Sequence, residues 1–186
     1  METMKKRQLK TMENNRKLTI SDLVLVAILL AAGAVLKIFV GSVVNFFGMK
    51  PNFIIAMYCL AIMLIKPRVY EAAIIGLLAG GICQFLPGTP YINFVSEFLG
   101  AIVAALMIKL PIKIGKMNVG TVVTAFVTTL VSGITYTICL LLFVNSGTSN
   151  FVVLAAYVPI VFFTAVINCI IVQLLYMPIK AAMKKQ

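Results

Sequence analysis

Residues 23–40 read LVLVAILLAAGAVLKIFV, an apolar run interrupted only by the charge of Lys37. A hydrophobic stretch of about 18 residues or more is long enough to cross the hydrocarbon core of a membrane as a helix. Further apolar runs follow along the chain, and all are too long for the strands of a membrane barrel. Because backbone polar groups in hydrocarbon must be satisfied within the segment, each run is predicted to be a helix.

The overall composition indicates a protein whose surface is partly in contact with lipid. Of the 186 residues, 62% are hydrophobic and 11% are charged, whereas soluble domains average about 45–50% apolar and about 25% charged residues. The predicted fold class is therefore an all-α integral membrane protein, with six transmembrane helices in one compact bundle. The helices are expected near residues 19–41, 51–65, 69–86, 91–110, 120–144 and 151–177. They form a predicted membrane domain over residues 18–180, between basic tails at 1–17 and 181–186.

The positions of the basic residues predict the orientation. If the N-terminus is cytoplasmic, all but two of the 16 lysines and arginines fall in the tails and in the inner loops. Only Lys37 and Lys50 remain on the outer side. This distribution follows the positive-inside rule and predicts a multi-pass protein of a bacterial cell membrane with both termini in the cytoplasm. The net charge of +11 is thus explained by topology, and no nucleic-acid partner is expected.

Several classes of function are disfavoured. The chain has no histidine and no CxxC motif, so neither a metal site nor a bound cofactor is expected. The four cysteines lie inside apolar runs, where they are expected to behave as small hydrophobic residues. The phosphate-binding motif GxxxxGK[ST] is absent, so the chain is not predicted to hydrolyse ATP itself. An enzyme is not expected.

The few charged residues near the membrane interior are the main candidates for function. Glu97 lies about two turns inside the outer end of its helix, and a carboxylate there costs about 2.5–3.5 kcal/mol on insertion scales. It is interpreted either as a ligand-facing acid or proton site, or as one half of an ion pair with Lys37 or Lys50. Glu97 and one of these lysines would together match a zwitterionic amino acid.

Uncharged polar residues form a second group. Asn52 and Asn93 are candidate ligand contacts, Asn93 because it lies one helical turn from Glu97. Asn168 and Gln173 are instead interpreted as links between helices. Aromatic residues gather at the predicted outer ends and indicate either an interfacial belt or a box for a flat apolar ligand; they are Phe46, Phe47, Phe85, Tyr91, Phe94 and Tyr157.

Two pairs of small residues are spaced four apart on their helices. Gly76 and Gly80 predict close packing inside the bundle. Ala27 and Ala31 on the first helix allow either internal packing or a docking face for another membrane protein.

Residues 48–52 (GMKPN), followed by an apolar run to residues 66–69 (KPRV), resemble the bacterial tryptophan transport protein family. Residues 31–36 (AAGAVL), Ile167-Asn168 and residues 176–178 (YMP) extend the likeness over nearly the whole chain. The family in turn looks like the substrate-binding S components of energy-coupling factor (ECF) transporters. That resemblance implies an outward-facing pocket and a partner module of one transmembrane coupling protein and two ATPases, with Ala27 and Ala31 facing the coupling protein.

Two positions depart from the family pattern. Lys37 stands where a histidine is common, and Glu97 lies near an expected Asp-Lys pair. The ligand is therefore expected to be tryptophan or another small aromatic or cationic compound, bound by Lys50, Asn52, Asn93 and Glu97, with Lys37 behind them. The alternative is a stand-alone secondary carrier for an amino acid or vitamin, with Glu97 as its proton-coupling group.

Overall fold

A computed structural model of the chain describes residues 18–43, 51–86, 88–89, 91–110, 119–144 and 150–183. Within these residues the chain forms six helices and no strands. They are α2 (Ile20–Val43), α3 (Ile54–Ile65), α4 (Val69–Gln84), α5 (Ile92–Met107), α6 (Gly120–Phe143) and α7 (Asn150–Met183). The prediction of an all-helical bundle is confirmed for this part of the chain.

The six helices differ in their ability to cross a membrane. Three are long and apolar enough to do so, in α2, α6 and α7. The 16 residues of α4 and of α5 extend about 24 Å each, and the 12 residues of α3 about 18 Å. Because the hydrocarbon core is about 30 Å thick, α3 is too short to span it.

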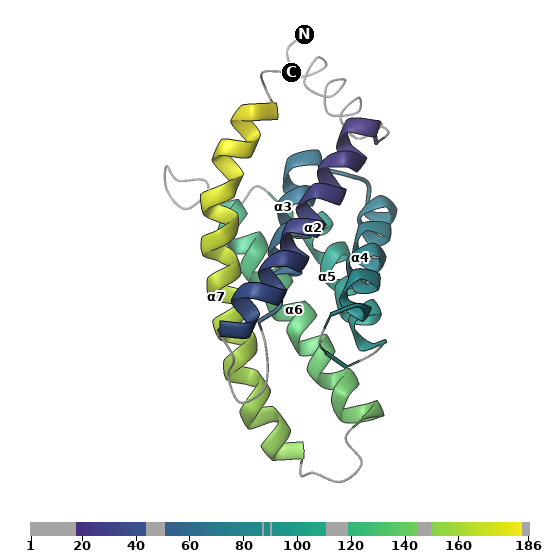
Figure 1. The fold of residues 1–186 in the computed structure, drawn as a ribbon, viewed down its shortest axis with the longest axis vertical. Coiled ribbons are helices and arrows are strands. Elements are labelled where there is room, and N and C mark those ends of the chain that lie inside the picture. Colours follow the sequence, from purple (N-terminus) through teal and green to yellow (C-terminus); the bar gives the residue numbers. More distant parts are fainter. Residues whose placement is uncertain are drawn as a thin grey trace.

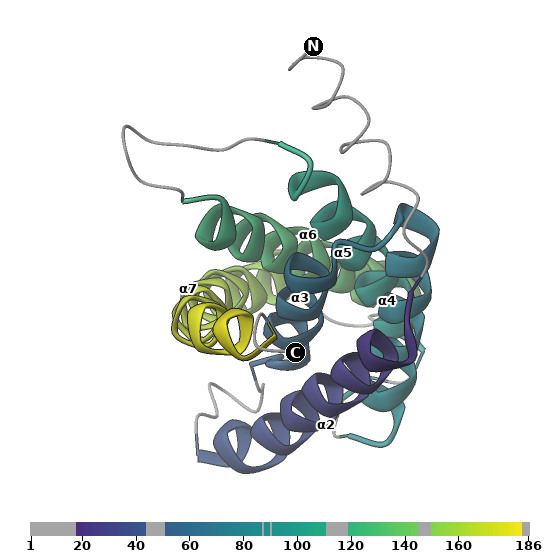
Figure 2. The ribbon, with the colours of Figure 1, turned by 90° about the horizontal axis from the view of Figure 1, so that it is seen from above.

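Helix α3 is the centre of the bundle. It packs against α2, α4, α5, α6 and α7, and the view from above shows it surrounded by them (Figure 2). Eleven of its residues are buried, and only Leu64 is half-buried. A helix that is apolar on every side is stable only when it is enclosed, which explains why the sequence of α3 shows no polar face. The start of α2 and the end of α7 lie at the same end of the bundle (Figure 1).

The helix ends follow local signals. Thr19 caps α2, since its hydroxyl accepts a hydrogen bond from the Asp22 amide at 3.3 Å while the Asp22 carboxylate accepts one from the Thr19 amide at 2.9 Å. This reciprocal arrangement is a capping box. Lys66, with a φ of 54°, ends α3 in the left-handed conformation before Pro67, so the predicted stop at this point is confirmed.

Three predicted helix boundaries are wrong by three residues or more, and one of them is the end of α5, which lies at Met107 rather than near residue 110. Helix α3 begins at Ile54, so Pro51 does not occupy its first turn. Asn52 is held outside the helix by tertiary hydrogen bonds described below. Helix α7 continues through Pro178 to Met183, beyond the expected end near residue 177. A proline removes one backbone donor from a helix, and the remaining hydrogen bonds suffice to continue the helix past it.

Gly76 and Gly80 bring α4 and α5 into close contact. A Cβ atom at Gly76 would lie 2.5 Å from the carbonyl oxygen of Glu97, and one at Gly80 would lie 2.8 Å from the Cα atom of Phe94. The predicted packing role of these glycines is confirmed. Their contact sets the distance of the α5 backbone, and hence of Glu97, from α4.

This contact predicts opposite effects for neighbouring glycines. Gly76→Ala and Gly80→Ala should each lower the free energy of unfolding by about 1–3 kcal/mol, because the methyl group overpacks the interface. Gly81→Ala is the matched control, since its Cβ would meet only the Phe94 ring, at 3.7 Å. That variant should be neutral or slightly more stable, because alanine favours helix. Thermal unfolding of the detergent-purified variants measures the difference, and equal losses in all three would contradict the packing role.

Candidate functional site

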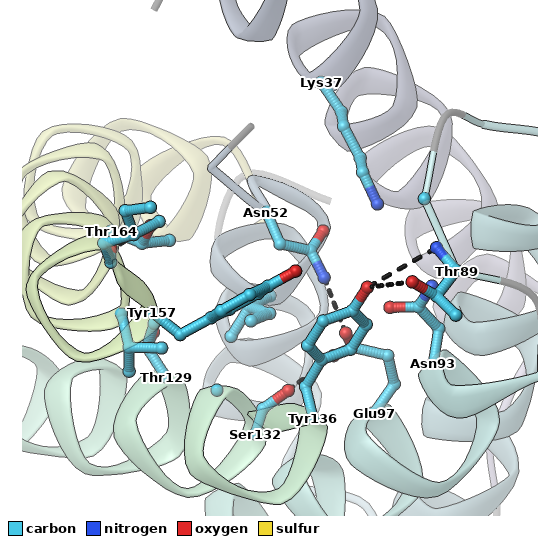
Figure 3. A pocket seen from close by; sticks show the side chains of 15 residues that line it. Lys37, Asn52, Thr89, Asn93, Glu97, Thr129, Ser132, Tyr136, Tyr157 and Thr164 are labelled. Carbon is cyan, nitrogen blue, oxygen red and sulfur yellow. Dashed lines mark hydrogen bonds between the residues drawn. The ribbon is translucent and has the colours of Figure 1, made fainter. Parts of the chain in front are cut away.

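A cavity of about 280 Å³ lies inside the bundle, at the end opposite the start of α2 and the end of α7. Its walls come from α2, α5, α6 and α7, the N-terminal end of α3 and the turn at residues 88–89. The volume is slightly below the range of about 300–1,000 Å³ typical of small-molecule sites. Lys37, Asn52, Asn93 and Glu97, all predicted ligand contacts, line this one cavity (Figure 3).

Glu97 is the most deeply buried charged residue of the site, with 1% of its surface exposed. Its carboxylate accepts two hydrogen bonds, one from Asn52 Nδ2 at 2.6 Å and one from Ser132 Oγ at 3.2 Å. The donors come from the segment before α3 and from α6. Hydrogen bonds to an ionised acceptor are roughly twice as strong as neutral ones, so these two contacts offset part of the cost of burying the carboxylate.

The side chain of Asn168, on α7, holds the main chain of Asn52 in place. Asn168 Nδ2 donates to the Asn52 carbonyl oxygen at 3.2 Å and to Thr129 Oγ1 of α6 at 3.3 Å. The predicted role of Asn168 as a link between helices is confirmed, and Gln173 makes a similar link by accepting a hydrogen bond from Thr121 at 3.1 Å. Asn168 therefore acts on the site indirectly, by positioning Asn52.

Lys37 enters the cavity from α2 and is 5% exposed. Its ammonium group contacts Cys83 Sγ at 3.5 Å, and sulfur is a weak acceptor. Among the described residues Lys37 forms no ion pair with Glu97, so the interpretation of Glu97 as its salt-bridge partner is wrong. The two opposite charges instead face one cavity from different helices (Figure 3). Lys50, the other predicted cation, lies outside the described residues.

The turn between α4 and α5 is tied to α6 beside the cavity. Tyr136 Oη donates to Thr89 Oγ1 at 2.9 Å (Figure 3). The Gln84 side chain of α4 accepts a hydrogen bond from the Tyr91 amide at 2.9 Å. These contacts hold the turn next to the first residues of α5. Asn93, 4% exposed, lines the cavity just beyond this turn.

The described members of the predicted aromatic group lie in three different places, and Phe94 is half-buried against Gly80 and Gly81 of α4, outside the cavity lining. Tyr157 lines the cavity and packs against Tyr136, with their ring centroids 6.1 Å apart and a tilt of 34°. Phe85 and Tyr91 are instead 90% and 76% exposed, as expected for residues at a membrane interface. Phe46 and Phe47 lie outside the described residues. One tyrosine from the group is therefore available to a ligand, together with Tyr136, which the sequence analysis did not single out.

Ala27 and Ala31 are exposed on α2, away from the cavity. Lys37, Gly33 and Leu30 occupy the buried side of the same helix. The two alanines therefore do not serve internal packing, and their face of α2 is free within the described part of the chain.

Comparison with known protein families matches residues 19–184 to the family described as tryptophan transporter TrpP. The match covers all six described helices in full. The chain belongs to the tryptophan transporter family. No curated protein and no solved structure matches it.

Family membership confirms the resemblance carried by residues 48–52 and 66–69 and identifies the chain as a membrane transport protein. The family is described as one of tryptophan transporters. An aromatic amino acid has a positive group, a negative group and a flat ring, and the cavity offers a carboxylate, an ammonium group and a tyrosine pair.

Five polar residues of the cavity were not predicted from the sequence: Thr89 of the turn, Thr129, Ser132 and Tyr136 of α6, and Thr164 of α7. The α6 residues are three and four positions apart, which places them on one face of the helix. This spacing could have indicated a polar face directed into the bundle. The α6 segment also carries hydroxyl residues on its other faces, so the sequence does not distinguish the functional face from them.

The link from Asn168 to Asn52 predicts an indirect effect on binding. Asn168→Ala should lower the free energy of unfolding by about 1–3 kcal/mol, since it leaves the buried Asn52 carbonyl without its donor. It should also weaken tryptophan binding, because Asn52 loses its fixed position. Gln173→Ala, which removes a more exposed link between α6 and α7, is the control and should leave binding unchanged. Thermal unfolding with and without tryptophan measures both effects; unchanged binding in Asn168→Ala would contradict the positioning role.

Proposed function

We propose that the chain is the membrane-embedded substrate-binding subunit of an ECF-type transporter, which binds tryptophan or a related small aromatic compound from outside a bacterial cell. Separate ATPase subunits would energise uptake through a transmembrane coupling protein. The observation that carries the proposal is the placement of Lys37 and Glu97 around one buried cavity, without an ion pair between them.

Opposite charges in one cavity suit a zwitterion. Glu97 accepts hydrogen bonds from two neutral donors and has no ion-pair partner within the described residues, so a substrate ammonium group would supply the missing cation. The ammonium group of Lys37 contacts the thiol of Cys83, which is a weak acceptor. Its positive charge would therefore be available to a substrate carboxylate. Buried charges are stable only when they are paired, so a ligand that supplies both missing partners has a strong reason to bind here.

The remaining walls suit an aromatic side chain. Tyr136 and Tyr157 line one side, and Ile55, Ile160 and Val161 contribute apolar surface. Aromatic rings pack favourably on one another in tilted or offset arrangements. The cavity is small, which favours one flat ring over a longer substrate.

The placement of the cavity supports uptake from outside. Lys66, Arg68 and Lys109 lie at the ends of α3, α4 and α5 far from the cavity, and Lys180 lies near the end of α7. By the positive-inside rule this basic end faces the cytoplasm. The cavity would then lie on the outer side.

The proposed partner module is supported by the free face of α2. Ala27 and Ala31 are exposed one turn apart, and small residues at this spacing allow another helix to approach closely in a membrane. The chain also lacks a phosphate-binding motif of its own, so ATP-driven uptake would need separate subunits.

The charge arrangement predicts which part of the ligand each residue binds. At about 100 times its dissociation constant, tryptophan should add roughly 2.7 kcal/mol to the stability of the purified chain. The chain should prefer tryptophan over tryptamine, which lacks the carboxylate, and over indolepropionate, which lacks the amine. Lys37→Met should remove only the first preference, and Glu97→Gln only the second, each with a roughly 10- to 100-fold loss of tryptophan affinity.

The control for this experiment is Lys109→Met, which removes an exposed cation at the far end of α5. It should leave all three affinities unchanged. Thermal unfolding without ligand reports whether each variant is folded. If Lys37→Met and Glu97→Gln weaken all three compounds equally, the two residues do not bind opposite ends of the substrate.

The partner face predicts a separation of binding from transport. Ala27→Leu and Ala31→Leu should abolish ATP-dependent uptake into vesicles that contain the coupling protein and ATPases, while tryptophan still stabilises the purified variants. Ala32→Leu is the matched control, because it places the same side chain on an exposed position of the same helix.

The stand-alone carrier, favoured by the complete burial of the Glu97 carboxylate, predicts the opposite result. Uptake would then persist without the partner module, follow a proton gradient and be lost in Glu97→Gln.

A further inference from the structure

The wall of the cavity opposite the charged residues carries two threonines. Thr129 of α6 and Thr164 of α7 line this side, whereas Lys37 and Glu97 lie on the other side (Figure 3). Both threonines are buried, with 2% and 5% of their surface exposed. A substrate whose charged groups face Lys37 and Glu97 therefore directs its opposite end toward this pair.

The protons of both hydroxyl groups are already used. Thr129 Oγ1 donates to the Ala125 carbonyl at 2.8 Å, and Thr164 Oγ1 donates to the Ile160 carbonyl at 2.7 Å. A threonine hydroxyl has one proton and two acceptor lone pairs. These two threonines therefore offer hydrogen-bond acceptors to the cavity and no donor.

The two oxygens differ in how much acceptor capacity remains, since Thr129 Oγ1 has one lone pair in use and Thr164 Oγ1 has none in use within the described residues. Thr129 Oγ1 accepts a hydrogen bond from Asn168 Nδ2 at 3.3 Å. No group in the described part of the chain donates to Thr164 Oγ1. Thr164 thus supplies a fixed, buried acceptor on the wall that faces the ring of an aromatic substrate.

The surroundings of Thr164 are apolar and tightly packed. Ile160 and Val161 lie one turn away on the same face of α7 and line the cavity. Across from them α6 approaches closely, since a Cβ at Gly133 would lie 2.5 Å from Val161 Cγ1. A ring N–H placed in the part of the cavity beside Thr164 would lose its water partners and would need an acceptor from the protein.

We propose that Thr164 is a specificity-determining residue, whose hydroxyl oxygen accepts a hydrogen bond from the ring N–H of an indole. The inference rests on the proposed function, because it places the charged end of the substrate between Lys37 and Glu97. It adds the feature that distinguishes an indole from other flat rings of similar size. A phenyl or benzothienyl ring fills the same part of the cavity but offers no donor to Thr164.

The test compares two ligands that differ at one atom. Benzothienylalanine has the shape and the charged groups of tryptophan, with sulfur in place of the ring N–H. The wild-type chain should bind tryptophan roughly 3- to 10-fold more tightly, the usual effect of one neutral hydrogen bond. Thr164→Val should lower the affinity for tryptophan by this factor and leave that for benzothienylalanine unchanged, whereas Thr164→Ser, which keeps the hydroxyl, should retain the preference.

The matched control is Thr137→Val. Thr137 of α6 is also buried and also donates to its own helix, to the Gly133 carbonyl at 2.8 Å, but it does not line the cavity. Its replacement should leave both affinities unchanged. Equal binding of the two ligands to the wild-type chain would overturn the inference even if a variant failed to fold, and so would an equal loss of both in Thr164→Val.

The two proposals fail in different ways. If the wild-type chain binds neither tryptophan nor benzothienylalanine, the proposed function is wrong and the inference falls with it. If tryptophan binding depends on Lys37 and Glu97 but not on the ring N–H, only the role of Thr164 is wrong.

Discussion

The buried carboxylate of Glu97 constrains the rest of the structure, because an ionisable group inside a membrane bundle must have fixed partners. Its donors, Asn52 and Ser132, come from two separate parts of the chain. Its own helix is held against α4 through the glycine at position 76, whose missing side chain leaves room for the Glu97 carbonyl. A shift of α5 by the size of one methyl group would change the geometry of both hydrogen bonds. The packing of α4 on α5 and the stabilisation of the buried carboxylate therefore depend on each other.

The short central helix creates the space that the charge faces. Helix α3 begins only at Ile54 and is about 18 Å long, so it leaves part of the bundle interior unfilled beyond its N-terminal end. Asn52 and Ile55, at that end, line the cavity. The N-terminus of a helix carries a partial positive charge, which favours anionic groups nearby. The same truncation that prevents α3 from spanning the membrane thus produces both the cavity and a favourable field for a carboxylate.

The sequence predicted the parts of the site that are chemically rare in an apolar chain. Charged or amide side chains such as Lys37 and Glu97 are conspicuous there, because burying them is costly, and the structure brings them to one cavity. Hydroxyl residues were missed because a hydroxyl group can donate its proton within its own helix at little free-energy cost, whichever face of the helix it occupies. Thr164 satisfies its proton within its own helix, so its presence alone does not reveal which face is functional. The contact of Lys37 with Cys83 depends on helix rotation, which hydrophobic patterning leaves open in helices that are apolar on most sides.

Helices α2 and α7, which carry Lys37 and Thr164 on the two sides of the cavity, do not pack on each other within the described residues. Within the described residues α7 packs only on α6 and α3, and α2 packs only on α3 and α4. A molecule that contacts both Lys37 and Thr164 would therefore connect α2 to α7, which do not otherwise touch. Its binding free energy would add to the cohesion of the assembled bundle, since a ligand stabilises the state in which all its contacts are present. Affinity for the ligand and the packing of α2 and α7 into one bundle are then coupled, and specificity follows because both ends of one small molecule must match at once.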